Sequence, residues 1–409
     1  MKEGDPLRRS RTPVRRRTAT TRIVSEVNRT IVLDTLRESG PMSRRRIIDE
    51  TGLSPATVNR LVDALKADRL VTDDERAPSR GGRPAQLVRF NARAQSVLAL
   101  TLGSDSLQGA VCDLAGNVRS RLARPLREGT RRAGPDTSFL VEQVIAFAVE
   151  LSGAADSWGA PVRAVAVGVP GVATGQDGLV EFAPALGWSS MPLGVRLTEE
   201  LGVPVVIEND VNLVALAAHR HTVGSGVEHL VALVADIGVG AGLVLGGRLH
   251  RGRLGAAGEV GYLLMERRSL DRSWPGFGDL ESSVGLSGIR RRIAEAHGDA
   301  APGYAALEDL FADARRGEPR ASRLVRGLAD DFALVVADIA VLISPDVVAL
   351  GGRTFMLGED LLVPAVESRL QGRIPLVPRL LPVDSAELQL TGAAELALET
   401  TGGSAFVVR

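Results

Sequence analysis

A glycine-rich stretch, residues 231–262, holds the residue types and spacing most suggestive of chemistry. An apolar run ends at Asp236, and Gly238 and Gly240 follow, which is the order of a phosphate-binding loop after a strand. Such a loop must lead into a helix, whereas the segment 243–247 is a short apolar run closed by two glycines. The pattern therefore predicts strand–turn–strand rather than a nucleotide loop.

Glu259 is the second candidate in this stretch, since it lies between Gly258 and Gly261. Glycine lets a ligand approach the backbone closely and adopts turns that strain other residues. A carboxylate in such a bend is therefore a candidate ligand-binding group. On this stretch alone a solvated side chain explains Glu259 equally well, and an ordinary acid at a strand end explains Asp236.

The segments that must position these residues alternate between strands and helices. Strands are predicted at 96–112 (two strands around a glycine turn), 162–169, 203–207 and 347–350, and helices at 138–152, 211–219 and 324–342. This alternation is typical of an α/β architecture. Polar groups and glycines recur just beyond strand ends, as in Glu208-Asn209-Asp210, where open α/β sheets bind ligands.

The first ninety residues predict a different module, with the spacing of a helix-turn-helix. Helices are expected at 22–38, at 44–50 and from Ser54 onward. Ser54 is the predicted N-cap of the third helix, and Pro55 occupies its first position. Residues 51–53 form a tight turn that contains glycine, which is the turn expected between the two helices of this motif.

The third helix leaves small or hydrogen-bonding side chains away from its buried stripe, where they suit base edges in a major groove. The candidate DNA-binding residues there are Ser54, Ala56, Thr57, Asn59 and Arg60. Strands at 70–72 and 87–90 predict a wing whose loop carries Arg80 and Arg83, and its slim Gly-Arg-Pro segment suits a narrow minor groove. A helical protein-interaction module is the alternative, but the turn, cap, wing and basic charge together favour double-stranded DNA.

Charge is distributed unevenly although the whole chain is neutral. Residues 1–90 carry 20 Lys and Arg against 12 Asp and Glu, a net of +8, and the remainder carries −8. A nucleic-acid-facing segment joined to an acidic globular part explains this asymmetry. Residues 1–21 are rich in arginine and poor in apolar side chains, which predicts a disordered segment, either a solubilising tail or a basic arm lying along phosphates.

Length and composition set the class of protein. A chain of 409 residues with 44% hydrophobic residues is expected to form two or three domains with full cores. The single cysteine, Cys112, excludes a disulfide framework and a cysteine-rich zinc site. We recognise neither a signal peptide nor an apolar run long enough to span a bilayer, so we expect a cytoplasmic protein with no membrane partner.

From residue 22 to the C-terminus the sequence resembles the ROK family (repressors, open reading frames and sugar kinases), specifically its winged-helix repressor branch. The motifs follow the family's order: GGRP in the wing, GVPG at 168–171, END at 208–210, GEVG at 258–261 and PDVVALGG at 345–352. The resemblance implies a winged helix-turn-helix domain at 22–91 and a two-lobe, actin-like sugar-kinase fold at 96–409. It also implies a sugar cleft between the lobes, near 208–210 and 258–281, and assembly as a homodimer or homotetramer.

The resemblance assigns sugar-binding roles to four residues of this cleft. Family kinases use the aspartate of an Asn-Asp pair as the base that deprotonates a sugar hydroxyl, and Asn209-Asp210 match that pair. Glu259 matches the glutamate that binds sugar hydroxyls, and Glu281 matches a second glutamate that closes the family's zinc-motif segment. Carboxylates and amides suit polyols because they hydrogen-bond paired hydroxyl groups in a fixed geometry.

Three departures separate this chain from the family's kinases. Thr101 replaces the aspartate of the first phosphate loop, and phosphoryl transfer depends on charge positioned around the metal and phosphates. Tyr262 replaces the zinc-binding histidine, and the segment 274–281 has none of the family's cysteines, so we expect no structural zinc and no cofactor. Ala185 stands where the family often has a sugar-contacting asparagine, which leaves the identity of the sugar open.

The sequence therefore predicts a sugar-responsive DNA-binding regulator, a repressor of carbohydrate uptake or catabolism genes, with a sugar or sugar phosphate in the cleft and no catalytic activity. An ATP-dependent sugar kinase carrying a DNA-binding domain is the first alternative, which Asp210 supports. A constitutive DNA-binding protein with a decayed cleft is the second, which Ala185 supports. Retention of Asn209 and of the three cleft carboxylates favours the sensor.

Overall fold

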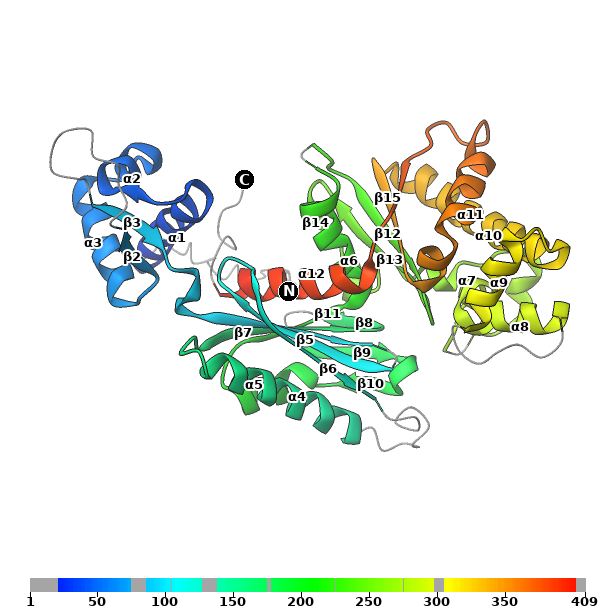
Figure 1. Cartoon of the computed structure of the whole chain (residues 1–409), viewed down its shortest axis with the longest axis horizontal. Coiled ribbons are helices and arrows are strands. Elements are labelled where there is room, and N and C mark those ends of the chain that lie inside the picture. The colour runs from blue at the N-terminus through cyan, green and yellow to red at the C-terminus, as the bar shows by residue number, and fades with distance from the viewer. Residues whose placement is uncertain are drawn as a thin grey trace, which may run out of the picture. The chain divides into compact units, whose positions relative to one another are not determined.

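The computed structural model describes residues 21–74, 86–103, 105–126, 138–174, 178–224, 226–274, 276–297 and 305–401. These residues form two compact units, one that ends at Asn91 and one that spans Ala92–Thr401. We call the second the ligand-binding unit, after the sugar cleft that is expected there. Figure 1 shows the elements of both.

The first unit is a winged helix-turn-helix. Its elements are α1 (Thr21–Ser39), β1 (Met42–Ser43), α2 (Arg44–Thr51), α3 (Pro55–Ala67), β2 (Val71–Asp74) and β3 (Leu87–Phe90). The three strands form an antiparallel sheet in the order β1-β3-β2. The predicted helices and wing strands are confirmed, with their ends shifted by one or two residues.

Local capping explains where the helices of this unit begin. The Ser43 hydroxyl accepts a hydrogen bond from the Arg46 amide, and the Ser54 hydroxyl accepts one from the Thr57 amide. Each bond satisfies an amide that a helix N-terminus would otherwise leave unpaired. Gly52 ends α2 at a φ of 67°, a left-handed conformation that glycine adopts without strain.

The core of the first unit contains the stripe predicted for the third helix. Val58, Leu61, Val62 and Leu65 of α3 are all buried, together with Ile47 of α2. Among the described side chains of α1, Val32 and Leu36 are buried apolar residues, and Ile31 is half-buried.

The ligand-binding unit is built on two five-stranded sheets of similar topology. The first, in the order β11-β7-β4-β5-β6, contains β4 (Ser96–Leu102), β5 (Ser106–Asp113), β6 (Val118–Pro125), β7 (Val162–Val169) and β11 (Val205–Asn209). The second, in the order β14-β13-β12-β15-β16, contains β12 (Leu230–Ala235), β13 (Val239–Leu245), β14 (Arg248–Leu249), β15 (Val347–Gly351) and β16 (Arg379–Pro382). Each sheet joins an antiparallel three-strand meander to two parallel strands.

Helices cover both sheets, and two of them lie between the sheets. The helices are α4 (Ser138–Asp156), α5 (Leu193–Leu201), α6 (Asp210–Ala217), α7 (Asp279–Val284), α8 (Leu286–His297), α9 (Ala305–Arg315), α10 (Pro319–Ile343), α11 (Arg353–Leu370) and α12 (Ser385–Thr400). Helix α12 packs on β4 and β7 of the first sheet, α6 packs on β12 and β13 of the second, and the two helices pack on each other (Figure 1). A small sheet of β8 (Val172–Thr174), β9 (Leu179–Ala183) and β10 (Trp188–Met191) extends the first half.

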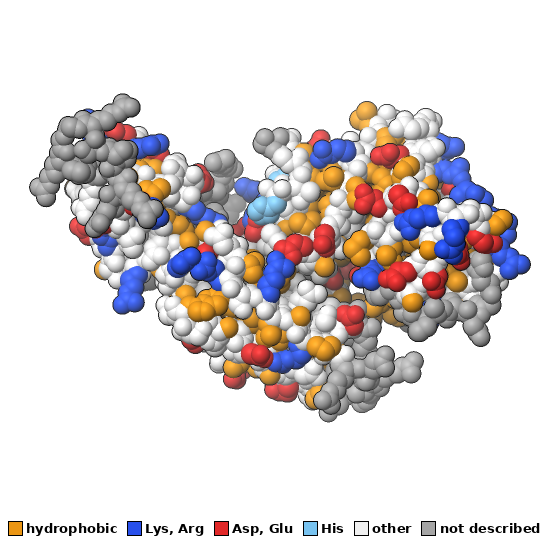
Figure 2. Space-filling view, viewed as in Figure 1, with side chains coloured by type: hydrophobic (Ala, Val, Ile, Leu, Met, Phe, Trp, Pro, Cys, Tyr) orange, Lys and Arg blue, Asp and Glu red, His pale blue; other side chains and the backbone are white. Residues whose placement is uncertain are grey.

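The outer face of each sheet packs against helices over a large hydrophobic core. Helix α4 packs against β5 in the first half, where it buries Val144, Phe147 and Leu151. By length and composition α4 is the one described helix that could cross a membrane, but this buried face identifies it as a core helix. In the second half the core lies between the sheet and α7–α11, and outer arginines such as Arg315 pair with acids such as Asp360, which gives the mixed charges visible in Figure 2.

Candidate functional site

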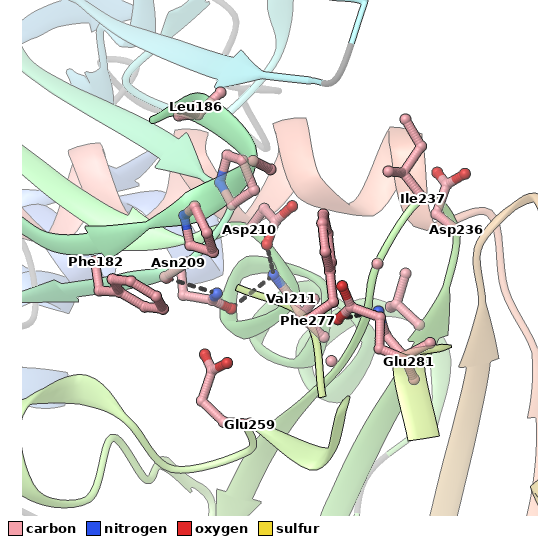
Figure 3. Close-up of a pocket in the computed structure, with 18 of the residues that line it drawn as sticks. Phe182, Leu186, Asn209, Asp210, Val211, Asp236, Ile237, Glu259, Phe277 and Glu281 are labelled. Carbon is pink, nitrogen blue, oxygen red and sulfur yellow. Dashed lines mark hydrogen bonds between the residues drawn. The ribbon is translucent and has the colours of Figure 1, made fainter. Parts of the chain in front are cut away.

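A cavity of about 200 Å³ lies between the two halves of the ligand-binding unit. The first half contributes residues at the ends of β4, β7 and β11, and the second half contributes the β12–β13 turn, the segment after Gly258 and the start of α7. All four residues predicted to bind sugar, Asn209, Asp210, Glu259 and Glu281, line it (Figure 3). Pockets for drug-sized ligands span about 300–1,000 Å³, so this cavity suits a smaller ligand.

Asn209 is the N-cap of α6. Its side-chain oxygen accepts hydrogen bonds from the amides of Val211 (2.9 Å) and Asn212 (3.0 Å), and its Nδ2 donates to the Gly171 carbonyl at 2.9 Å. Gly171 has a φ of 112°, and a Cβ there would lie 2.3 Å from the Phe182 carbonyl oxygen, so the turn requires glycine. The side-chain amide of Asn209 therefore fixes the wall of the cavity, and one of its two Nδ2 hydrogens remains for a ligand.

Glu208 supports this segment from behind, although sequence reasoning gave it no role. Its side chain is 1% exposed, and its Oε1 accepts hydrogen bonds from the Asn209 amide and from Asn212 Nδ2. Its Oε2 accepts from Arg251 Nε at 2.7 Å. Both oxygens are paired, which is what a buried carboxylate requires.

Asp210 begins α6 and faces the cavity. Its Oδ1 accepts a hydrogen bond from the Val211 amide at 2.9 Å. Burial, together with the nearby charges of Glu259 and Asp236, raises the pKa of Asp210 to about 7, against the opposing effect of that amide. The group is thus shared between carboxylate and carboxylic acid near neutral pH, as a proton acceptor or hydroxyl-binding group can be.

Glu259 reaches the cavity from the glycine-rich segment of the second half (Figure 3). A Cβ at Gly258, whose φ is 91°, would lie 1.8 Å from the Ala241 carbonyl oxygen, so only glycine brings the chain this close to β13. Within the described part of the chain, no hydrogen bond satisfies the Glu259 carboxylate, and burial raises its pKa. The carboxylate is therefore available to a ligand.

Glu281 projects from α7 on the same side. Its Oε2 accepts a hydrogen bond from the Val239 amide at 3.2 Å, and it packs against Gly238 and Gly261. Burial is the main cause that raises the pKa of Glu281 to about 7, and the charge of Glu259 adds to it. The glycines of the 231–262 stretch thus make room for this carboxylate, and the predicted strand–turn–strand is confirmed as β12 and β13.

Several cavity residues lie outside the sequence prediction. Asp236 lines the cavity at the end of β12, and Gln389 lines it from α12. Three aromatic side chains, Phe182, Tyr262 and Phe277, are also lining residues. Asp236 carried a usable signal, since it ends a buried strand beside glycines, and Tyr262 stands at the position of the family's zinc-binding histidine. Phe182, Phe277 and Gln389 carried no signal.

Two positions where the sequence departs from family kinases differ in their placement. Ala185 lines the cavity, so its small side chain leaves space there. Thr101 is 5% exposed within β4 and is not a lining residue, although Leu102 and Gly103 are. Among the described residues, no group of three His, Cys, Asp or Glu side chains could hold a metal ion, so the carboxylates are spread around the cavity rather than gathered at one point.

The candidate DNA-binding residues of the first unit lie on and just before α3. Ser54, Ala56, Asn59 and Arg60 are exposed and Thr57 is half-buried, and the hydroxyls of Ser54 and Thr57 are 2.8 Å apart. The Asn59 side-chain oxygen accepts from Arg44 of α2 at 3.0 Å. Arg45 of α2, which the sequence reading passed over, is also exposed. Arg80 and Arg83 lie outside the described residues.

Comparison with known families matches both units. The profile described as ROK family matches residues 97–399, and that described as winged helix-turn-helix DNA-binding matches residues 30–72. A putative xylose repressor of a Caldicellulosiruptor species is 25% identical over 82% of this chain and 86% of its own length. The Escherichia coli DNA-binding transcriptional dual regulator NagC is 24% identical over 85% of each chain.

Solved structures match the fold. A ROK family transcriptional regulator, a homologue of the E. coli MLC protein, superposes with a TM-score of 0.77, at 24% identity, over 93% of this chain and 97% of its own. A ROK family glucokinase from Streptomyces griseus, in complex with glucose and AMPPNP, gives a TM-score of 0.60 at 25% identity over 74% of this chain and 99% of its own. The two-lobe, actin-like fold preceded by a winged helix-turn-helix is thereby shown. With three quarters of its length matched by the family profile, the chain belongs to the ROK family.

Proposed function

We propose that this protein is a sugar-responsive DNA-binding transcriptional regulator, a repressor of genes for carbohydrate uptake or catabolism. The observation that carries the proposal is a carboxylate-lined cavity of monosaccharide size in the same chain as a winged helix-turn-helix unit. Relatives that align over most of both chains are named putative xylose repressor and N-acetylglucosamine repressor, which supports the same function. We place the protein in the cytoplasm.

The sugar would bind through Asp210, Glu259 and Glu281, which accept hydrogen bonds from its hydroxyls, with Asn209 holding the wall and donating to the ligand. These groups come from both halves of the ligand-binding unit, so a bound sugar favours the arrangement in which both halves contact it. The Glu208–Arg251 ion pair links the halves beside the same segment and would be strained or relieved by that change. Ligand binding thereby changes the population of the DNA-binding state.

On the DNA side, α3 would enter the major groove with Ala56, Thr57, Asn59 and Arg60 at base edges and Ser54 near the backbone. Arg45 adds a phosphate contact, and we retain Arg80 and Arg83 as wing contacts. A homodimer or homotetramer would place two such helices on a palindromic operator. For a ligand to weaken operator binding tenfold, it must favour the non-binding state by about 1.4 kcal/mol.

Titration of sugars against a labelled operator fragment tests this function. We expect at least one monosaccharide to lower operator affinity and to raise the melting temperature, and Asp210→Asn to remove both effects while sparing DNA binding without sugar. An exposed change away from the cavity, Glu199→Gln, serves as control. If no sugar or sugar phosphate changes either quantity, the proposed function is wrong.

A sugar kinase with a DNA-binding domain is the second candidate, because Asp210 occupies the place of the catalytic base and the S. griseus glucokinase shares the fold. We rank it lower because Thr101 offers no charge for a metal or phosphate. An ADP-release assay across hexoses and amino sugars decides between them. Turnover that Asp210→Asn abolishes would reverse the ranking.

A further inference from the structure

The charged side chains among the described lining residues of the cavity are all acidic. Four carboxylates line it, those of Asp210, Asp236, Glu259 and Glu281. Among its described lining residues there is no lysine, arginine or histidine. No three of these acids could share a metal ion, so their charge is spread over the cavity wall.

The backbone amides at the start of α6 and at Val239 do not compensate for this charge, because side chains of the protein already accept from them. The N-terminus of α6 would be a natural anion site, but the Val211 amide is taken by Asn209 Oδ1 and Asp210 Oδ1, each at 2.9 Å. The Asn212 amide is likewise taken by Asn209. On the other wall, the Val239 amide donates to Glu281. The protein thus uses these donors on its own side chains, those of Asn209, Asp210 and Glu281.

The cavity therefore offers mainly acceptors. Asn209, Gln389 and Tyr262 can donate hydrogen bonds to a ligand, but none of them carries a positive charge. Sugar hydroxyls and protonated amines donate, whereas a phosphate dianion only accepts and adds negative charge to a wall that already carries it. Burial is the main cause that raises the pKa values of Asp210 and Glu281 to about 7, and the charges of neighbouring acids add to it. Like charges brought together in a binding site weaken binding.

We propose that this cavity selects its effector by charge and takes a sugar without a phosphate group, either neutral or carrying a protonated amine. The inference rests on the proposed function and narrows it, since the sequence left sugar and sugar phosphate equally open. Phosphorylation of the sugar then removes it as a ligand, so the regulator reports the sugar before phosphorylation.

Calorimetry with the full-length protein and matched ligand sets tests the inference. Each set holds a sugar, its amino sugar and its phosphate ester, for example glucose, glucosamine and glucose-6-phosphate, with the equivalent mannose and galactose sets. We expect affinity to fall in the order amino sugar, sugar, phosphate ester, with the ester at least about tenfold weaker than the sugar. A phosphate ester that binds as tightly as its parent sugar overturns the inference and leaves the sensor function standing.

Two variants separate charge selection from fit. Glu259→Gln keeps the shape and removes one charge, so the ratio of ester to sugar dissociation constants should fall severalfold, whereas Glu199→Gln, outside the cavity, should leave it unchanged. Gln389→Lys places a cation on the α12 wall and should tighten the ester in particular. If neither cavity variant changes the ratio, charge does not determine selection and the inference fails. Absence of binding by every ligand instead contradicts the proposed function itself.

Discussion

Arg251 and Glu208 join the two halves of the ligand-binding unit through a 2.7 Å hydrogen bond between a half-exposed guanidinium and a carboxylate that is 1% exposed. Arg251 follows β14 of the second sheet, and Glu208 lies in β11 of the first. The Glu208 carboxylate also accepts a hydrogen bond from the backbone amide of Asn209, the residue before Asp210. The pair therefore links the orientation of the halves to the shape of the cavity wall.

Arg251→Gln should destabilise the protein by about 2–3 kcal/mol, because it leaves a buried carboxylate without its charged partner. Arg315→Gln is the matched control, since Arg315 is about as exposed as Arg251 but pairs with an exposed acid, Asp360. Loss of the Arg315–Asp360 ion pair should lower the free energy of unfolding by less than about 1 kcal/mol. Chemical denaturation measures both values, and equal costs for the two variants would show that burial of Glu208 is unimportant.

Gly258→Ala should be among the most damaging alanine substitutions in the unit. The new Cβ would lie 1.8 Å from the Ala241 carbonyl oxygen, at a φ of 91°, so the chain must move and Glu259 with it. We expect the free energy of unfolding to fall by about 3 kcal/mol or more, and ligand binding to be lost. Gly153→Ala in α4, where nothing lies within 4 Å, should be neutral or stabilising by up to about 1 kcal/mol. Comparable melting temperatures for the two variants would contradict this account.

The cavity acids should make the ligand-free protein more stable at mildly acidic than at alkaline pH. Asp210 and Glu281 have pKa values of about 7 in the folded state against 3.8 and 4.5 as ordinary groups, so the folded state binds more protons between these limits. Their contribution is present below about pH 4 and is lost as pH rises through about 7. The gain in melting temperature from Asp210→Asn or Glu281→Gln should therefore grow from pH 5 to pH 8. A gain that shrinks over this range would reverse the sign and refute the prediction.

Arg60 and Arg45 should each contribute to DNA binding in a distinguishable way. Arg45→Ala, at a phosphate, should weaken binding to all sequences alike and lower the salt slope by about one. Arg60→Ala, at a base edge, should cost about 1–3 kcal/mol and relax specificity at one operator position. Arg163→Ala, an exposed arginine of the ligand-binding unit, is the control. Titrations at several salt concentrations give both quantities, and unchanged affinity in both variants would remove α2 and α3 from the interface.

Features that depend on neighbours in the chain could be predicted from the sequence. Ser54 and Pro55 determine the start of α3 whatever surrounds them, and the run from Leu230 to Leu245 reads as two strands because its alternation of apolar residues and glycine is local. Features that depend on packing could not. Gln389 reaches the cavity from the last helix, and Arg251 contacts Glu208, which is 43 residues away in the sequence. No sequence pattern predicts either contact.

The return of α12 to the first sheet has a consequence for synthesis. Gln389, part of the cavity wall, belongs to this last helix, whereas the DNA-binding unit ends at Asn91. At about 5–20 residues per second, translation of the 310 residues of the unit Ala92–Thr401 takes about 15–60 s. During that interval the winged helix-turn-helix unit of each new chain is already synthesised, but the cavity wall is not complete. The repressor therefore acquires its DNA-binding unit before it can respond to a ligand.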